Sequence, residues 1–314
     1  MKKQKINLQN VGMKKLGKEI WRSRQVYLMI LPVAIWLILF VYWPMYWLRI
    51  SLYDFSLYKG FEGSTFVGIQ NYIELFTKRD MLQKMWNALA LNMYSLVLGF
   101  PAPIIFALFL NEMRFRKGKK VVQTVSFLPH FIAMVAMVAI IKEVLSPTQG
   151  LAADIFRYFG KEPIYFLGEP KYFRWIMTLS GIWQETGWNA IVYLSALTAI
   201  DVSLYEAAMV DGANRWHRLW HITLPSIVPT IITLLILRIG SMLSVGYEKI
   251  YLLQNPTNLA QSEVVSTYVY KQGLLEMDYS LGVTAGLFNG VIAFILVYVS
   301  NEVSKRFDDS AGIW

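Results

Sequence analysis

The chain has 314 residues, of which 55% are hydrophobic and 16% are charged, a balance too apolar for a soluble domain of this size. The net charge of +9 would suit nucleic acid, but the basic residues lie beside long apolar runs, so we expect a membrane and no nucleic-acid partner. The sequence has no cysteine, which excludes disulfides, and its three histidines do not form an HExxH pattern, so no metal ion is expected.

The N-terminal part of the sequence joins a basic segment to the first apolar run. Residues 1–25 carry eight Lys and Arg, and residues 26–50 are apolar over a length that crosses a bilayer. The run lacks the small-residue cleavage site of a signal peptide, so we expect it to remain as the first span. We interpret residues 1–25 as a cytoplasmic tether at the anionic inner leaflet.

Apolar stretches of spanning length recur along the chain and predict an all-α membrane protein. The six predicted transmembrane helices are 26–50, 85–111, 123–146, 175–200, 222–246 and 279–303. They form one membrane domain over 26–303, followed by a short tail, 304–314. Lys and Arg are denser in four of the remaining segments than in the other three, and by the positive-inside rule these four face the cytoplasm: 1–25, 112–122, 201–221 and 304–314. The prediction is therefore N-in/C-in.

Proline and glycine predict local irregularities in this layout. Pro101 and Pro103 lie inside the second span and are expected to break it, so that it bends within the bundle. Gly68 predicts a turn in the first outer loop, ahead of an amphipathic segment. A short helix is expected at 152–159 in the second outer loop.

The polar segment 201–221, between the fourth and fifth spans, predicts two short helices joined by a turn. Ser203 and Glu206 have the spacing of a capping box, and Gly212 suits a left-handed turn at the end of the first helix. A second helical piece is expected from Asn214 to His221. Leu224-Pro225 is expected to restart a helix, because proline is tolerated in a first turn.

Two opposite charges lie near the middle of the fourth and fifth spans. Charges at that depth are costly and normally face a cavity or a partner. We expect Glu185 and Arg238 to border a polar cavity, where they either pair with each other or contact substrate. The full set of candidate substrate-path residues is Gln184, Glu185, Trp188, Asn189, Tyr193, Arg238 and Tyr247.

Beyond the fifth span, the sequence predicts an outer helix and a packing stripe. Ser262 can cap a helix that runs through Gln272. The sixth span carries Gly282, Gly286 and Gly290 at four-residue spacing, which is typical of close helix packing. The partner helix is either another span of this chain or a helix of a second subunit.

The polar segment also carries a family resemblance. The spacing Glu206-Ala207-Ala208, Gly212 and Leu224-Pro225 resembles the EAA loop of the permeases of binding-protein-dependent ABC importers. The runs LILRIGSMLSVGYEKIYLLQNP and STYVYKQGL look like the oligosaccharide and polysaccharide permeases within that family. The resemblance implies a type I ABC importer permease bundle in the bacterial cytoplasmic membrane. It implies that ATPase coupling rests on Glu206, Ala207, Ala208, Asp211, Gly212, Leu224 and Pro225.

The same resemblance implies partners and cofactors. An importer of this kind combines a second homologous permease chain (usually a different one), two cytoplasmic ATPase subunits and an extracellular or periplasmic substrate-binding protein. The sequence has no GxxxxGK[ST] phosphate loop, so ATP and Mg²⁺ are expected on the ATPase subunits and no cofactor or enzymatic activity on this chain. The expected substrate is an oligosaccharide.

Other functions stay open from sequence alone. Within the importers, the substrate could instead be a monosaccharide, a polyol or a phosphorylated glycerol. A passive channel would need no coupling loop, which the intact EAA pattern argues against. A membrane-embedded enzyme should show paired carboxylates or a metal motif, and the sequence offers neither.

Overall fold

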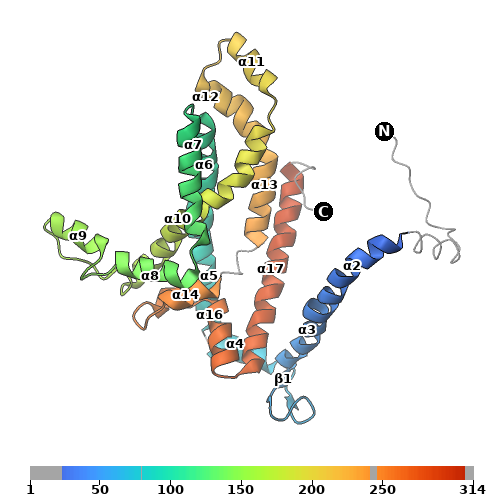
Figure 1. Cartoon of the computed structure of the whole chain (residues 1–314). Helices are drawn as coiled ribbons and strands as arrows, with labels where there is room; N and C mark the ends of the chain where they lie inside the picture. The colour runs from blue at the N-terminus through green and yellow to red at the C-terminus, as the bar shows by residue number, and fades with distance from the viewer. Residues whose placement is uncertain (1–22, 79, 241–245, 308–314) are drawn as a thin grey trace. The chain divides into compact units, whose positions relative to one another are not determined.

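The computed structural model describes residues 23–78, 80–240 and 246–307, and Figure 1 shows its elements in chain order. Most of the predicted 1–25 segment, the end of the predicted fifth span at 241–245 and the last seven residues of the tail lie outside the described residues. Four described helices are each long and apolar enough to cross a membrane, and the number rises to six if each of two bent helix pairs is one span.

A candidate span lies where the sequence predicted one at 26–50, and all but its last two residues belong to the first of two structural units, which ends at Ile50. It runs as one apolar helix over Arg24–Leu52. It consists of α2 (Arg24–Leu37), a wide turn at Ile38–Tyr42, α3 (Trp43–Met45) and a 3-10 turn at Tyr46–Leu52. No side chain of α2 is buried, which suits a helix that faces lipid.

The second unit begins at Ser51 and holds the remaining helices. A small antiparallel pair, β1 (Tyr53–Asp54) with β2 (Thr65–Phe66), precedes α4 (Gln70–Lys78). Gly68 has a φ of 58°, which confirms the predicted turn. Leu75 of α4 is fully buried, so the predicted amphipathic segment packs with this face inward.

The second span is one helix over Met81–Glu112, built from α5 (Met81–Tyr94) and α6 (Pro101–Glu112). The predicted break at the prolines is wrong. A wide turn at Ser95–Gly99 comes first, closed by the Phe100 N–H, which donates to the Ser95 oxygen at 3.0 Å. Pro101 is the first residue of α6, directly after this turn, and the span continues through it.

The third predicted span, 123–146, is not a single helix. The helix α7 (Arg116–Phe127) and a 3-10 turn at Leu128–Phe131 meet α8 (Met134–Val144) at an angle of 103°. Ile132 and Ala133 are extended between them, and we name this bend the elbow. Pro129 helps to end the first piece because a proline disfavours helical continuation around it.

The later spans are longer helices. The fourth is α10 (Pro170–Thr198), which follows α9 (Leu151–Tyr158) and turns by 66° into α11 (Val202–Val210). The fifth runs over Arg215–Ile239 and contains α12 (Arg215–Arg218) and α13 (Leu224–Gly240). The sixth is α17 (Tyr279–Phe307), and the segment before it holds α14 (Tyr247–Leu253), α15 (Leu259–Ser262) and α16 (Val265–Val269).

Helix α10 lies against α5, α6, α7 and α13, and it belongs to two of the three apolar clusters found among the described residues. One cluster joins α6, α10 and α13 through buried residues such as Leu110, Tyr193 and Ile227. Another joins α8, α10 and α14 through Met137 and Ile250 among others. The two pieces on either side of the elbow have different main partners: α7 packs on α10, whereas α8 packs chiefly on α14 and shares an apolar cluster with α10.

One prediction for the C-terminal part needs correction. Ser262 does not cap a helix through Gln272, because it ends α15 and its hydroxyl donates to Asn258 Oδ1 at 2.9 Å. In the glycine stripe, a Cβ on Gly282 would lie 2.6 Å from the Cα of Gly273, so this position packs within the chain. Among the described residues no atom lies within 4 Å of such a Cβ on Gly286 or Gly290, and their packing role stays a prediction.

Candidate functional site

The segment 201–221 begins with a capped helix, although the cap is not the predicted one. Asp201 caps α11, and its carboxylate accepts from the Ser203 N–H at 2.9 Å. Ser203 lies inside the helix, because Asp201 is extended (φ −63°, ψ 124°) and already takes the N-cap position. The hydrogen bond from the Ser203 backbone, with a second from its side chain, holds the pKa of the exposed Asp201 carboxyl below its ordinary value.

The turn after α11 is as predicted. Gly212 has a φ of 78°, and the Ala213 N–H donates to the Ala208 oxygen at 2.8 Å. A left-handed residue at this point satisfies the last carbonyls of the helix, and glycine adopts that conformation without steric cost. Glu206 and Ala207 on α11 are exposed, so this face of the helix is open to a partner.

The second helix of the segment begins where it was predicted but does not end at His221. Asn214 caps α12, with its side-chain oxygen accepting from the His217 N–H at 2.8 Å. The helix then continues through a wide turn at Leu219–Thr223 into α13, so Leu224-Pro225 does not restart a helix. The Tyr205 hydroxyl and Thr223 Oγ1 lie 2.9 Å apart and tie α11 to the base of the fifth span.

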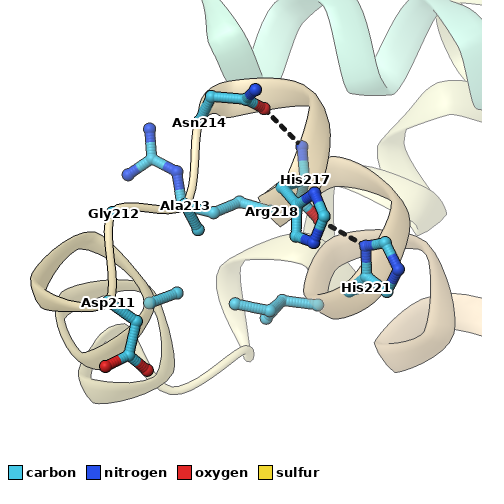
Figure 2. Close-up of a pocket in the computed structure, with 9 residues that line it drawn as sticks. Asp211, Gly212, Ala213, Asn214, His217, Arg218 and His221 are labelled. Carbon is cyan, nitrogen blue, oxygen red and sulfur yellow. Dashed lines mark hydrogen bonds between the residues drawn. The ribbon is translucent and has the colours of Figure 1, made fainter.

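A pocket of about 500 Å³ lies between the two arms of this segment. Figure 2 shows the turn from Asp211 to Asn214 on one side and the rings of His217 and His221 on the other. These rings stack, with centroids 4.3 Å apart. Their helix also exposes Trp216. In Figure 1 the segment lies at one end of the second unit, away from α4 and α16. It is therefore a shaped, exposed surface suited to docking.

A second cavity, of about 400 Å³, lies among α6, α10, α13 and the wide turn before α6. Four of the predicted substrate-path residues line it: Glu185, Asn189, Tyr193 and Arg238. We name it the central cavity. The three from α10 are spaced four residues apart, so they lie on one face of that helix.

The two charges of the central cavity have different partners. Glu185 Oε2 accepts from His130 Nδ1 at 3.1 Å, and Arg238 Nη2 donates to the Ser95 hydroxyl. The prediction that both border one cavity therefore agrees with the geometry. The direct Glu185–Arg238 pair, which was one of the two predicted roles, is not what these contacts form.

The other three candidate residues lie outside the central cavity lining. Gln184 is buried and accepts from Lys249 Nζ at 3.3 Å. Trp188 stacks on His130, with ring centroids 4.4 Å apart and planes 3° from parallel. Tyr247 stacks on Tyr270 at 4.9 Å. Gln184 therefore packs between α10 and α14, whereas Trp188 and Tyr247 keep an exposed side.

Sequence reasoning missed His130 and Lys249. His130 ends the first piece of the third span and reaches Glu185, 55 positions along the chain. The polar residue directly after Pro129, within an apolar run, was the available signal. Among the described residues, no group of three His, Cys, Asp or Glu is arranged to hold a metal ion.

Comparisons with known proteins agree with this architecture. The model of a family described as binding-protein-dependent transport system inner membrane component matches residues 13–309. The polygalacturonan/rhamnogalacturonan transport system permease protein YteP of Bacillus subtilis (strain 168) is 41% identical over 296 residues, which are 94% of this chain and 92% of that protein.

Two crystal structures contain chains of closely similar fold. One is of a bacterial ABC transporter involved in the import of the acidic polysaccharide alginate, with a TM-score of 0.86 and 39% identity over 94% of this chain and 99% of that one. The other is of the bacterial alginate ABC transporter in complex with an alginate pentasaccharide-bound periplasmic protein, with a TM-score of 0.85 and 40% identity over 93% and 98% of the two chains.

These matches confirm the all-α type I ABC importer permease fold, the membrane location and the transport role. They also confirm dependence on a substrate-binding protein, since the matching family is defined by it. The chain belongs to the family of inner membrane components of binding-protein-dependent transport systems.

Proposed function

We propose that this chain is the permease subunit of an ATP-driven importer that passes acidic oligosaccharides. Arg238 in the central cavity is the observation that carries the substrate class. A guanidinium group binds a carboxylate through two parallel, charge-assisted hydrogen bonds. Support also comes from the similar proteins, whose descriptions name polygalacturonan, rhamnogalacturonan and alginate.

The other lining groups suit a sugar ring. Asn189 and Tyr193 offer groups that pair with hydroxyls, and the cavity volume of about 400 Å³ lies in the range of small-molecule sites. Transporters commonly hold their substrate near the middle of the bilayer, between helices that move against each other. Glu185 lies near the middle of α10, and Arg238, in the last turn of α13, lines the same cavity, so the two charges together mark one candidate site.

Coupling to ATP is assigned to the exposed segment 201–221. We propose an N-in/C-in orientation, in which Glu206, Asp211 and Gly212 contact one of two cytoplasmic ATPase subunits that hold ATP and Mg²⁺. A second permease chain completes the membrane part, and the binding protein delivers the sugar on the opposite side. The position of α11 and α12 at the end of the second unit away from α4 and α16 supports this assignment (Figure 1).

The substrate class is tested by changing the cavity cation. Arg238→Gln should lower uptake of a galacturonate tetrasaccharide about tenfold, because a charge-assisted hydrogen bond contributes roughly 1.5–3 kcal/mol. Uptake of the fully methyl-esterified tetrasaccharide should change less than about twofold, since that ligand carries no charge for the guanidinium. Arg238→Lys should retain part of the acid uptake. Both rates are measured in proteoliposomes that contain the whole complex, with the binding protein outside.

The matched substrates separate the possible roles of Arg238. An equal loss with both sugars would mean that Arg238 only supports the fold. No loss with either sugar would remove the central cavity from the substrate path. Both results contradict the proposal.

A further inference from the structure

Three contacts fasten the elbow of the third span to one stretch of α10. His130 Nδ1 donates to Glu185 Oε2 at 3.1 Å, and its ring lies flat on Trp188. Between these two positions, a Cβ on Gly187 would lie only 2.1 Å from the Ser126 oxygen, so the backbones of α7 and α10 are in close contact. The imidazole ring is thus held on one face by an aromatic ring and at one edge by a carboxylate.

Glu185 is the point where this fastening meets the substrate path, because it also lines the central cavity. Each element around it supplies a cation or a group that can become one. His130 comes from the third span, and Arg238 lies on α13 and shares the cavity. Lys249 on α14 binds the neighbouring Gln184 and interacts electrostatically with Glu185.

The charge of Glu185 is unfavourable for the proposed substrate. A carboxylate in the cavity wall repels the uronate groups of an acidic sugar at close range. A hydrogen bond from an imidazole draws the carboxylate toward the third span, and in its protonated form the imidazole also cancels the charge. With the charge of Glu185 offset in this way, the positive charge of Arg238 dominates the electrostatic potential in the central cavity.

We propose that His130 is a positioning residue that sets the charge selectivity of the central cavity. Its hydrogen bond draws the Glu185 carboxylate toward the third span and so weakens the repulsion of an acidic sugar. This inference rests on the proposed passage of acidic oligosaccharides through that cavity. His130 acts only through Glu185, so its importance should vanish when residue 185 carries no charge. A residue that merely held the elbow in place would matter for every substrate alike.

The experiment uses the whole reconstituted complex with the galacturonate tetrasaccharide and its methyl ester. His130→Ala should lower uptake of the acid about tenfold relative to uptake of the ester, which corresponds to about 1.4 kcal/mol, because the like charge left in the wall repels the acid. Adding Glu185→Gln to His130→Ala should restore the acid-to-ester ratio to within about threefold of that of the unchanged chain. His130→Gln, which keeps a donor but no charge, should lie between the unchanged chain and His130→Ala.

Phe131→Leu is the matched control, since Phe131 packs against the rings of both His130 and Trp188 but carries no charge toward Glu185. It should change uptake of both sugars by the same factor.

The inference is overturned if His130→Ala lowers uptake of both sugars equally, or if the acid-to-ester ratio of the double variant is no higher than that of the single one. If His130→Ala prevents assembly, an unchanged ratio in His130→Gln overturns it instead. In all these cases a selective effect of Arg238→Gln leaves the proposed function standing, whereas its absence removes both.

Discussion

Gly187→Ala is expected to destabilise the protein, whereas Gly181→Ala, six residues earlier on the same helix, is not. A Cβ on Gly187 would lie 2.1 Å from the Ser126 oxygen, which belongs to the backbone and cannot turn away. The two helices must separate, and overpacking of this kind costs about 1–3 kcal/mol or more. At Gly181 no atom lies within 4 Å of an added Cβ among the described residues. Alanine should stabilise the helix there by roughly 0.5–1 kcal/mol.

The measurement is thermal unfolding of the purified complex, with the two variants prepared side by side. The expected result is a lower midpoint for Gly187→Ala and an unchanged or slightly higher one for Gly181→Ala. The docking of α7 on α10 also holds His130 beside Glu185, so Gly187→Ala should lower transport as well. Equal midpoints for the two variants would contradict the close contact between these helices.

Gly212→Val is expected to uncouple transport from ATP hydrolysis, although this position has free space around it. No atom lies within 4 Å of an added Cβ among the described residues, so the effect comes from the backbone φ of 78°. A left-handed conformation costs an ordinary residue about 1–2 kcal/mol, and a β-branched residue more. The turn that presents α11 and α12 would then be populated roughly tenfold less.

Gly212→Asn is the control, because asparagine tolerates the left-handed conformation. Uptake per ATP hydrolysed should fall about tenfold for the valine variant and stay near normal for asparagine. The melting temperature should change little in both, since Gly212 lies in an exposed turn. Normal coupling with valine would mean that the shape of this turn does not matter for the ATPase contact.

The positions of the spans follow largely from the lengths of the apolar runs. The elbow does not, because residues 123–146 are apolar on both sides of it and composition alone favours one straight helix. The direction of α8 is decided by its packing on α14, more than a hundred residues away, through Met137 and Ile250. Only Pro129 and His130 gave a local sign that the helix ends there.

The structure of part of the segment 201–221 could be predicted from its residue types alone. Gly212 and Asn214 have the conformation and the capping bond that their residue types favour. Asp201 and Ser203 are both good N-caps, and the sequence could not decide which one starts the helix. The wide turn at Leu219–Thr223, which carries the helix past Leu224-Pro225, has no clear sequence signal.

The candidate residues of the cavity divide by helical periodicity. Glu185, Asn189 and Tyr193 share a face of α10 and line the cavity, whereas Gln184 and Trp188 lie on the neighbouring face and pack against other helices. Counting by fours from Glu185 would have separated the two groups. The partner of Glu185 could not be found in this way, because His130 reaches it only through the elbow.

Whether this chain serves an ATP-driven importer of acidic sugars is decided most directly by uptake of a galacturonate tetrasaccharide into proteoliposomes. The vesicles contain this chain, its partner permease and the ATPase subunits, with the binding protein outside. We expect uptake against a gradient that requires both internal ATP and the binding protein. Uptake that stops at equal concentrations and proceeds without ATP would instead show a passive channel.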